Sequence, residues 1–173
     1  PLKVSFCKSL SLVQLVSHPK PNKMFNKNYP FYTSGSKYMV QHFKKYAQWI
    51  KKKYLGKNGK ILEIGSNDGT FLKNFKKNFS IGYEPSKSVH DVAISNKLKS
   101  VNKFFNIKNI QNLIKKKIRF DVIVGSNVIC HIPDQVNLIR SMDKLLAKNG
   151  RIIFEEPYLG AMYSKTSYDQ LYD

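Results

Sequence analysis

The sequence predicts an α/β domain whose doubly wound parallel sheet carries helices on both faces. Short apolar runs that fit buried strands alternate along the chain with segments whose apolar residues recur at intervals of three and four, as in amphipathic helices. The first of these strands ends in a glycine-rich turn, residues 65–69, which a helical pattern follows. A chain of 173 residues can bury one ordinary core. We therefore expect one domain with an appended piece.

The expected elements follow in a regular order. Residues 1–35 are expected to form an irregular arm, because Pro19, Pro21 and Pro30 interrupt regular structure. A helix is expected from Ser36 to just before Gly56, with an apolar stripe of Met39, Phe43, Ala47, Ile50 and Tyr54. Strands are then expected at 60–64, 80–84, 103–105, 120–125 and 151–155, and helices at 71–78, 87–97, 108–117 and 135–147. Because the chain stops soon after the fifth strand, we expect a truncated sheet.

The segment ILEIGSNDGTFL, residues 61–72, carries the strongest functional signal. Gly65 and Gly69 allow the backbone to pass close to a ligand, and Thr70 can cap the helix that follows. The turn lacks the Lys-Ser/Thr ending of a P-loop and the third glycine of a dinucleotide fingerprint. Such a turn alone also occurs in α/β domains that bind no ligand there. A phosphate-free adenosine compound is therefore the ligand that fits it best.

Acidic residues near this turn narrow the ligand further. Glu84 ends the next predicted strand, about 20 residues after Gly65, where a carboxylate can accept hydrogen bonds from both ribose hydroxyls. A glycine-rich turn followed by this acid predicts S-adenosylmethionine as the cofactor. Glu63 lies within the first strand and is either a partner of the ligand's amino group or a strand-edge charge.

Charge and cysteine content restrict the partners. The net charge of +19 would suit a nucleic acid, but only Arg119, Arg140 and Arg151 are arginines and the remaining basic residues are scattered lysines. We therefore expect a solvated basic surface and no nucleic-acid partner. Cys7 and Cys130 form no disulfide framework, and neither a signal peptide nor an apolar run of about 18 residues is present. These features predict a cytoplasmic protein that does not enter a membrane. Cys130 is expected to be a small buried hydrophobe, with a catalytic thiol as the alternative.

Polar residues after the last two strands form a second candidate cluster. Asn127 and His131 follow the strand at 120–125, and Glu155, Glu156 and Tyr158 follow the strand at 151–155. All five are expected to face the crevice at the carboxyl ends of the strands. His131 is either a general base or a packed histidine bound to a loop carbonyl. The two glutamates either bind a ligand or cap the next helix.

Taken together, the order and spacing of several segments resemble a known family. The segments are CKSLSLVQL, YPFYTSGS with QHF after it, LEIGSNDGTFL, GYEPS, SNVICHIPD, and FEEPY followed by YDQLYD. They resemble the class I S-adenosylmethionine methyltransferases, and more narrowly the nucleotide-sugar C-methyltransferases. This resemblance covers nearly the whole chain and implies the Rossmann-like sheet of that class.

The resemblance also implies roles for individual residues. Cofactor contacts would come from Gly65, Ser66, Asn67 and Gly69 around methionine and ribose, Glu84 at the ribose hydroxyls, Pro85 and Ser86 beside the adenosine, Phe104 or Phe105 at the adenine, and Asn127 at the methionine end. Substrate contacts would come from Tyr29 and Ser34 in the arm, from Ser36 at the start of the following helix, and from Glu156 and Tyr158. His131 and Tyr172 would be the catalytic base and hydrogen-bond donor, in an order that stays open.

The chain departs from the family at two places. Asp173 stands where the family has the first histidine of its catalytic His-Glu-His stretch, and the sequence ends before the Glu and the second His of that stretch, so the family's base is not demonstrable in this sequence. Leu10 stands where the family's zinc module has the C-x-x-C partner of Cys7, and one thiolate cannot hold a structural zinc. We therefore expect no metal. Residues 1–35 would be a remnant of that module, and residues 36–173 a methyltransferase domain incomplete at its C-terminus.

The implied reaction is methylation of a carbon atom in a nucleotide-linked keto-sugar, a small-molecule substrate. Two alternatives stay open. One is a methyltransferase that acts on RNA or protein, and its RNA binding would depend steeply on salt. The other is a non-catalytic remnant that still binds the cofactor.

Overall fold

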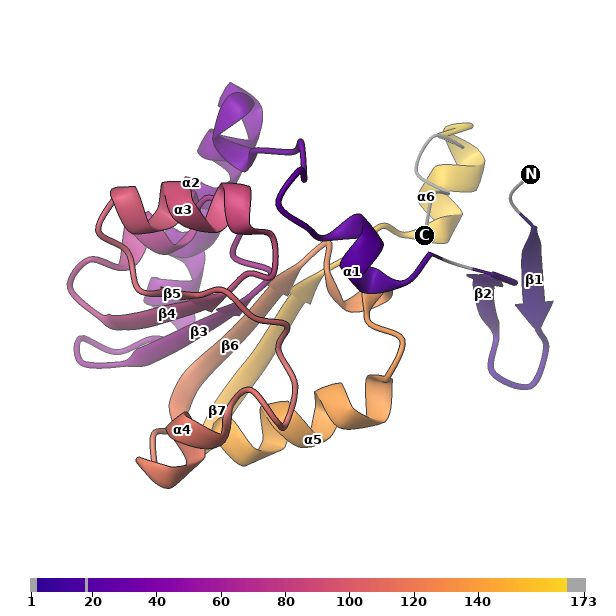
Figure 1. Ribbon diagram of the computed structural model, residues 1–173. Coiled ribbons are helices and arrows are strands. Elements are labelled where there is room, and N and C mark those ends of the chain that lie inside the picture. The colour runs from indigo at the N-terminus through magenta and orange to yellow at the C-terminus, as the bar shows by residue number, and fades with distance from the viewer. Residues whose placement is uncertain (1–2, 18, 168–173) are drawn as a thin grey trace.

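Five parallel strands form the central sheet, in the order β5-β4-β3-β6-β7 (Figure 1). The computed structural model describes residues 3–17 and 19–167. The strands are β3 (Lys60–Ile64), β4 (Phe79–Tyr83), β5 (Ser100–Val101), β6 (Phe120–Ser126) and β7 (Leu146–Glu155). The order reverses between β3 and β6, the switch point where open α/β sheets bind ligands beyond the carboxyl ends of their strands. The predicted doubly wound parallel sheet is confirmed.

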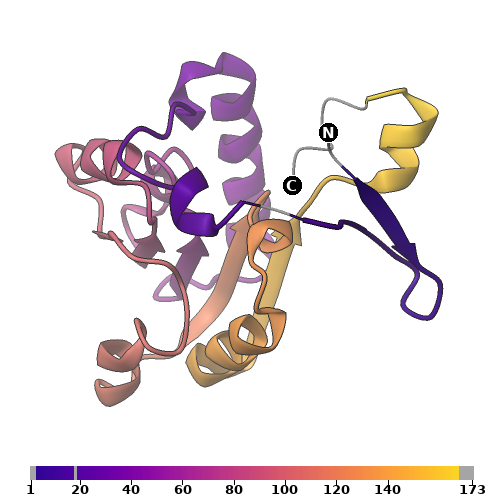
Figure 2. The same cartoon turned by 45° about the vertical axis from the view of Figure 1, so that its right-hand side comes forward.

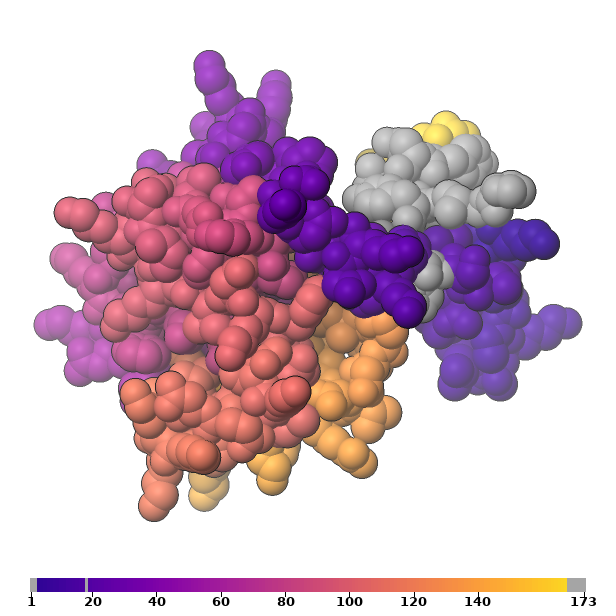
Figure 3. All heavy atoms as spheres, in the orientation of Figure 1, coloured from indigo at the N-terminus to yellow at the C-terminus, as the bar shows by residue number. Residues whose placement is uncertain are grey.

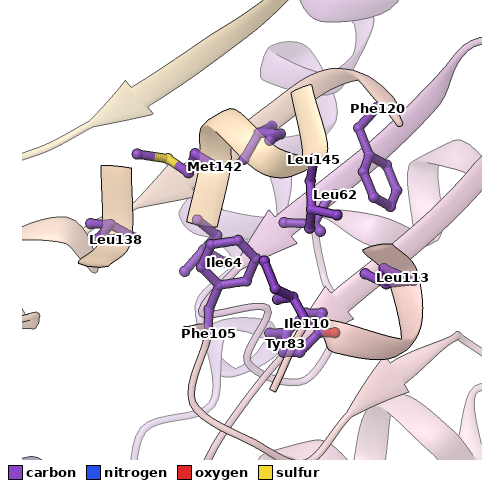
Figure 4. Packing of buried hydrophobic residues seen from close by; sticks show 11 residues of the cluster. Leu62, Ile64, Tyr83, Phe105, Ile110, Leu113, Phe120, Leu138, Met142 and Leu145 are labelled. Atoms are coloured by element: carbon purple, nitrogen blue, oxygen red, sulfur yellow. The ribbon is translucent and has the colours of Figure 1, made fainter. Parts of the chain in front are cut away.

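Helices cover both faces of the sheet, as Figure 1 shows. One face packs against α2 (Lys37–Lys53) through Phe43, Ala47 and Ile50, which are buried beside Ile61. The other face packs against α4 (Gln111–Lys115) and α5 (Gln135–Leu145), and Figure 4 shows this core. Its labelled side chains are Leu62, Ile64, Tyr83, Phe105, Ile110, Leu113, Phe120, Leu138, Met142 and Leu145.

The alternation of side chains along β3 decides the position of Glu63. Leu62 and Ile64 point to the face under α4 and α5, whereas Ile61 points to the face under α2. Successive side chains of a strand point to opposite faces, so Glu63 shares the α2 face with Ile61. Because β3 is the middle strand of the sheet, the interpretation of Glu63 as a strand-edge charge is wrong.

The predicted helix at 71–78 is only a short 3-10 turn, η2 (Leu72–Phe75). The side-chain amide of Asn74 donates to the carbonyl oxygens of Thr70 and Phe71 at 3.1 and 2.9 Å. Asparagine side chains that bond to nearby backbone compete with the hydrogen bonds of an α-helix. The apolar residues of this segment, including Phe71 and Phe75, are nevertheless buried as the pattern predicts.

Three other elements differ in position from the prediction. The last strand, β7, begins at Leu146 and not at 151, so the helix expected at 135–147 ends as α5 at Leu145. The third strand is β5, at 100–101, because the chain turns at Lys103, whose N–H donates to the carbonyl of Val101 at 2.8 Å. The predicted strand at 103–105 is therefore wrong. The helix expected at 108–117 is shorter and forms only α4. Before α4, the side-chain oxygen of Asn106 accepts the backbone N–H of Asn109 at 3.0 Å in a turn. After α4, Lys117 adopts a φ of 52°, which is not helical. The helix at 87–97 is confirmed as α3 (Lys87–Ser95).

The first 35 residues are more regular than predicted. They contain an antiparallel hairpin of β1 (Val4–Cys7) and β2 (Leu12–Leu15), a short helix α1 (Pro21–Met24) and a 3-10 turn η1 (Thr33–Gly35). Figure 2 shows that the hairpin stands away from the sheet, on the same side as α6 (Leu159–Ser164). The hairpin exposes Phe6 and Leu10 to 60% and 72%.

Within the described part of the chain, no helix is long and apolar enough to span a membrane. Residues 3–17 and 19–167 also contain no group of three or more histidine, cysteine, aspartate or glutamate side chains placed to hold a metal ion.

Candidate functional site

A cavity of about 1420 Å³ lies at the carboxyl ends of the strands. Its walls come from the loop after β3, the turn after β4, the segment after β5, the loop after β6, and Pro157, Leu159 and Met162 after β7. The arm forms a further wall, and Figure 3 shows it lying across this face of the molecule. The segments after all five strands and the arm therefore meet around one space large enough for a ligand.

Gly65 and Asn67 shape the loop after β3. Gly65 has a φ of +69°, and a Cβ built there would lie 2.7 Å from Cγ2 of Val128 in the loop after β6. Asn67 has a φ of 47°, a left-handed conformation that asparagine tolerates better than most residues. Gly65 is thus needed both for the turn and for close packing of the two loops, and both residues line the cavity.

Glu84 joins the loop after β3 to the turn after β4. Its Oε2 accepts the backbone N–H of Asn67 at 2.9 Å, and its Oε1 accepts the backbone N–H of Ser86 at 2.7 Å. Burial raises the pKa of Glu84, while the hydrogen bonds from Ser86 and Asn67 act in the opposite direction. Each carboxylate oxygen has a further lone pair, so the carboxylate can accept additional hydrogen bonds from a ligand in the cavity.

Three buried acids lie in this loop or next to it. Glu63, Asp68 and Glu84 are only 4%, 3% and 4% exposed, and they are the only charged side chains among the buried residues of the described chain. Burial raises the pKa of Glu63 well above its usual range, and the charges of Glu84 and Asp68 raise it further. Within 3–17 and 19–167, Oε2 of Glu63 has no hydrogen-bond partner. In a chain of net charge +19, this acidic site suits a ligand that carries positive charge.

Aromatic side chains line the cavity beyond β5. Phe104 and Phe105 both contribute to the wall, and Phe105 also packs edge-on against Tyr83 with ring centroids 5.3 Å apart. Pro85 lies in the same wall. The amide of Asn102 donates to the carbonyl oxygens of Glu84 and Pro85 at 2.8 and 3.0 Å, which fixes the turn beside them. A flat, apolar ligand ring would fit against this wall.

His131 lies in the loop after β6, at the end of the 3-10 turn η3 (Ile129–His131), and lines the cavity. Its ring packs against Phe25 of the arm, with centroids 5.7 Å apart. Glu156 holds this loop through Oε1, which accepts the backbone N–H groups of Val128 and Ile129 at 3.1 and 2.8 Å. Asn127, with a φ of 52°, also lines the cavity.

The structure brings most of the predicted site residues to the cavity. They are Gly65, Ser66, Asn67, Glu84, Pro85, Phe104, Asn127, Tyr29, Ser36 and His131. Among the described residues, Gly69, Ser34, Ser86, Glu156 and Tyr158 lie outside its lining. Tyr172 lies outside the described residues.

The residues that lie outside the lining have other contacts. A Cβ built on Gly69 would collide with Leu98, so this glycine allows the loop to pack against the segment after α3. Tyr158 is 76% exposed. Glu155 accepts the Nε2 proton of His42 at 2.9 to 3.0 Å, which ties β7 to α2. Cys130 is exposed at the cavity wall, so the prediction that it is buried is wrong.

Sequence reasoning missed two contributors, Asp68 and Phe25. The carboxylate of Asp68 accepts the backbone N–H of Ser34 at 2.8 Å, and Phe25 packs against His131. Both contacts join the arm to the sheet across long stretches of sequence. The one sequence signal for Asp68 is its position between Gly65 and Gly69 in the glycine-rich turn.

Comparisons with known proteins identify the family. The sequence profile of a family described as "Methyltransferase domain" matches residues 38–172. The chain belongs to this methyltransferase family. S-adenosyl-L-methionine is the cofactor of such enzymes, and the acidic, glycine-shaped cavity of this methyltransferase chain fits it, because the ligand carries a sulfonium and an ammonium group.

Individual relatives of this methyltransferase are distant. The C-methyltransferase NovU of Streptomyces niveus is 23% identical over 175 residues, covering 99% of this chain and 41% of NovU. The ubiquinone biosynthesis O-methyltransferase of Coxiella burnetii is 26% identical over 110 residues, covering 62% of this chain and 47% of that protein. This chain therefore spans less than half the length of either relative.

A solved structure supports the fold. A SAM-dependent methyltransferase from Archaeoglobus fulgidus superposes with a TM-score of 0.59 at 20% identity, over 75% of this chain and 58% of that one. At this identity the likeness concerns the fold of the methyltransferase domain alone.

Proposed function

We propose that this chain binds S-adenosylmethionine in the cavity and belongs to a cytoplasmic enzyme that methylates a carbon atom of a nucleotide-linked keto-sugar. Similarity to NovU along 99% of the chain supports the choice of a C-methyltransferase. The proposal assigns the cofactor to residues 36–173 and gives the arm, residues 1–35, the task of covering it. The substrate is a small molecule that enters the same cavity.

The observation that carries the proposal is the cluster of buried acids at the glycine loop. Asp68 and Glu84 place negative charge where water is largely excluded, Glu63 beside them has a carboxyl oxygen without a hydrogen-bond partner in the described chain, and no buried lysine or arginine of the described chain lies among them. Burying such charges is costly unless a partner compensates them. When bound, S-adenosylmethionine supplies a methyl group on a positively charged sulfur, and its ammonium group adds a second positive charge.

Different residues around the cavity would bind different parts of the cofactor. Glu84 would accept hydrogen bonds from the ribose hydroxyls with the lone pairs that Asn67 and Ser86 leave free. Phe104 would lie against the adenine, and the loop that contains Gly65 would surround the methionine part. Val128 and Gly65 hold the loops together at the switch point of the sheet.

His131 is the candidate base on the substrate side. A keto group acidifies the hydrogens on the neighbouring carbon, and an imidazole near neutral pH can accept such a proton. The contact with Phe25 and the bonds from Glu156 to the backbone of its loop hold the ring at the cavity wall. Tyr29 of the arm and Ser36, at the start of α2, line the same cavity and would contact the sugar.

An oxygen atom is the competing acceptor, since the Coxiella burnetii relative is an O-methyltransferase. Incubation with radiolabelled S-adenosylmethionine tests the two against each other. The substrates are nucleotide-linked 4-keto-sugars and, as matched controls, the same nucleotides with the 4-keto group reduced to a hydroxyl. Label in the keto-sugars alone supports the proposal, because only they have an acidified carbon. Label in the reduced sugars would contradict it.

A further inference from the structure

The segment of residues 29–35, which we call the strap, is fastened to the glycine loop through its backbone. Asp68 Oδ2 accepts the N–H of Ser34 at 2.8 Å, and Asn67 Oδ1 accepts the N–H of Thr33 at 3.0 Å. The amide of Asn67 also donates to the carbonyl oxygen of Phe31 at 3.1 Å. Three bonds therefore join three strap residues to two loop residues that lie more than 30 positions further along the sequence.

A second attachment comes from the turn after β4. The hydroxyl of Ser88, in the first turn of α3, donates to the carbonyl oxygen of Tyr29 at 3.1 Å. Glu84 already ties this turn to the loop through Asn67 and Ser86. The two turns that would hold the cofactor are thus the same two turns that hold the strap.

Of the three side chains that accept these bonds, Asn67, Asp68 and Glu84, Asp68 is the one that does not line the cavity of the described chain. Its Oδ1 accepts the N–H of Thr70 at 3.1 Å while its Oδ2 accepts the N–H of Ser34. The side chain is 3% exposed and, among the described residues, is not part of the cavity lining. Tyr29, Phe31 and Thr33 of the strap do line the cavity. Asp68 therefore fixes a wall of the cavity from outside it.

We infer that Asp68 is a positioning residue that couples docking of the strap to occupation of the cofactor cavity. The inference rests on the proposed function, because it takes the cavity as the cofactor site. A ligand that holds the loop in its present shape keeps Asn67 Oδ1 and Asp68 Oδ2 in position to accept the N–H groups of Thr33 and Ser34. By thermodynamic reciprocity, the docked strap must then raise the affinity for the ligand by the same factor.

Asp68→Asn is a sharp test, because the amide keeps the size of the carboxylate but has only one acceptor oxygen for two N–H groups. Asp68→Ala removes both acceptors. Asp121 provides the matched controls, Asp121→Asn and Asp121→Ala. Its Oδ2 accepts a backbone N–H, that of Lys60, at 2.7 Å at the amino end of β3, far from the cavity.

Two quantities are measured for each variant. Calorimetric titration with S-adenosylhomocysteine gives the affinity, and NMR hydrogen exchange gives the opening of the strap at the amides of Thr33 and Ser34, with and without that ligand. We expect the ligand to slow exchange of these amides in the unmodified chain. In both Asp68 variants we expect faster exchange and an affinity lower by about 5- to 20-fold, with no such loss in the Asp121 variants.

The outcomes separate this inference from the proposed function. If the unmodified chain binds no S-adenosylhomocysteine, the proposed function fails. If it binds, but the Asp68 variants match the Asp121 variants in affinity and the ligand leaves strap exchange unchanged, the coupling is refuted and the proposed function stands. A loss of affinity without faster strap exchange would also refute it, because Asp68 would then act on the loop alone.

Discussion

Glu84 accepts the backbone N–H of Asn67 at 2.9 Å, and this bond connects the carboxyl ends of two neighbouring strands. The carboxylate therefore has a structural task before any ligand arrives, since it orients the loop that follows β3. Burial raises its pKa, and the hydrogen bonds from Ser86 and Asn67 partly offset that effect. The cavity is consequently built in advance of binding, which lowers the ordering cost that a ligand must overcome.

The buried Glu63 predicts an unusual dependence of stability on pH. Burial, with the charges of Glu84 and Asp68, raises its pKa well above the ordinary 4.5. A raised folded-state pKa means that the folded chain binds the proton more tightly than the unfolded chain does. The stability from Glu63 is therefore full below the unfolded pKa and is lost as pH rises through the folded pKa.

Glu63→Gln should remove this loss, because glutamine does not ionise. Urea unfolding across pH should show the variant gaining stability over the unmodified chain as pH rises above the ordinary glutamate pKa. Asp91→Asn is a suitable control, because Asp91 is an exposed partner of Lys87. A constant difference between Glu63→Gln and the unmodified chain at all pH values would show that Glu63 is not the group that titrates.

His131→Ala should separate binding from turnover. Loss of a general base typically lowers the rate by about 10² to 10⁴, whereas the cofactor contacts stay in place. Methyl transfer to a keto-sugar and the affinity for S-adenosylhomocysteine are measured together. His90→Ala is the matched control, because His90 bonds to Ser100 at 3.0 Å and lies outside the cavity lining of the described chain. Transfer that continues at the original rate in His131→Ala would exclude His131 as the base.

Purified protein should contain no stoichiometric zinc. Cys7 bonds to Ser9 at 3.3 Å, and Leu10, at the position of a second thiolate, is 72% exposed on the hairpin. A structural zinc needs four ligands, and Cys7 supplies one. Elemental analysis checks this after dialysis without chelator. One tightly held zinc ion per chain would contradict it.

The fold and the cavity could be predicted from sequence where the signal is local. Gly65 sits where an apolar strand ends, and Glu84 sits at the end of the next strand, so periodicity alone places both at one edge of a parallel sheet. The stripe of α2 is equally local, and Phe43, Ala47 and Ile50 are buried as predicted.

The missed features depend on contacts that the sequence does not display. Asp68 bonds to Ser34 across 34 positions, and Phe25 reaches His131 through the fold of the arm. The expected strand at 103–105 failed because its phenylalanines serve the cavity wall and the core, whereas Ser100 and Val101 pair with β4. At 103–105, tertiary packing therefore overrode the local strand propensity.

Calorimetric titration of S-adenosylhomocysteine into the unmodified chain and into Glu84→Gln tests the cofactor site most directly, with Asp121→Asn as control. Glutamine keeps one acceptor oxygen and loses the charge, so the affinity should fall by about 10- to 100-fold, the range expected when a hydrogen bond to a charged group is lost. Asp121→Asn should bind as the unmodified chain does. Absence of binding by the unmodified chain, or equal binding by Glu84→Gln, would contradict the assignment of this cavity to S-adenosylmethionine.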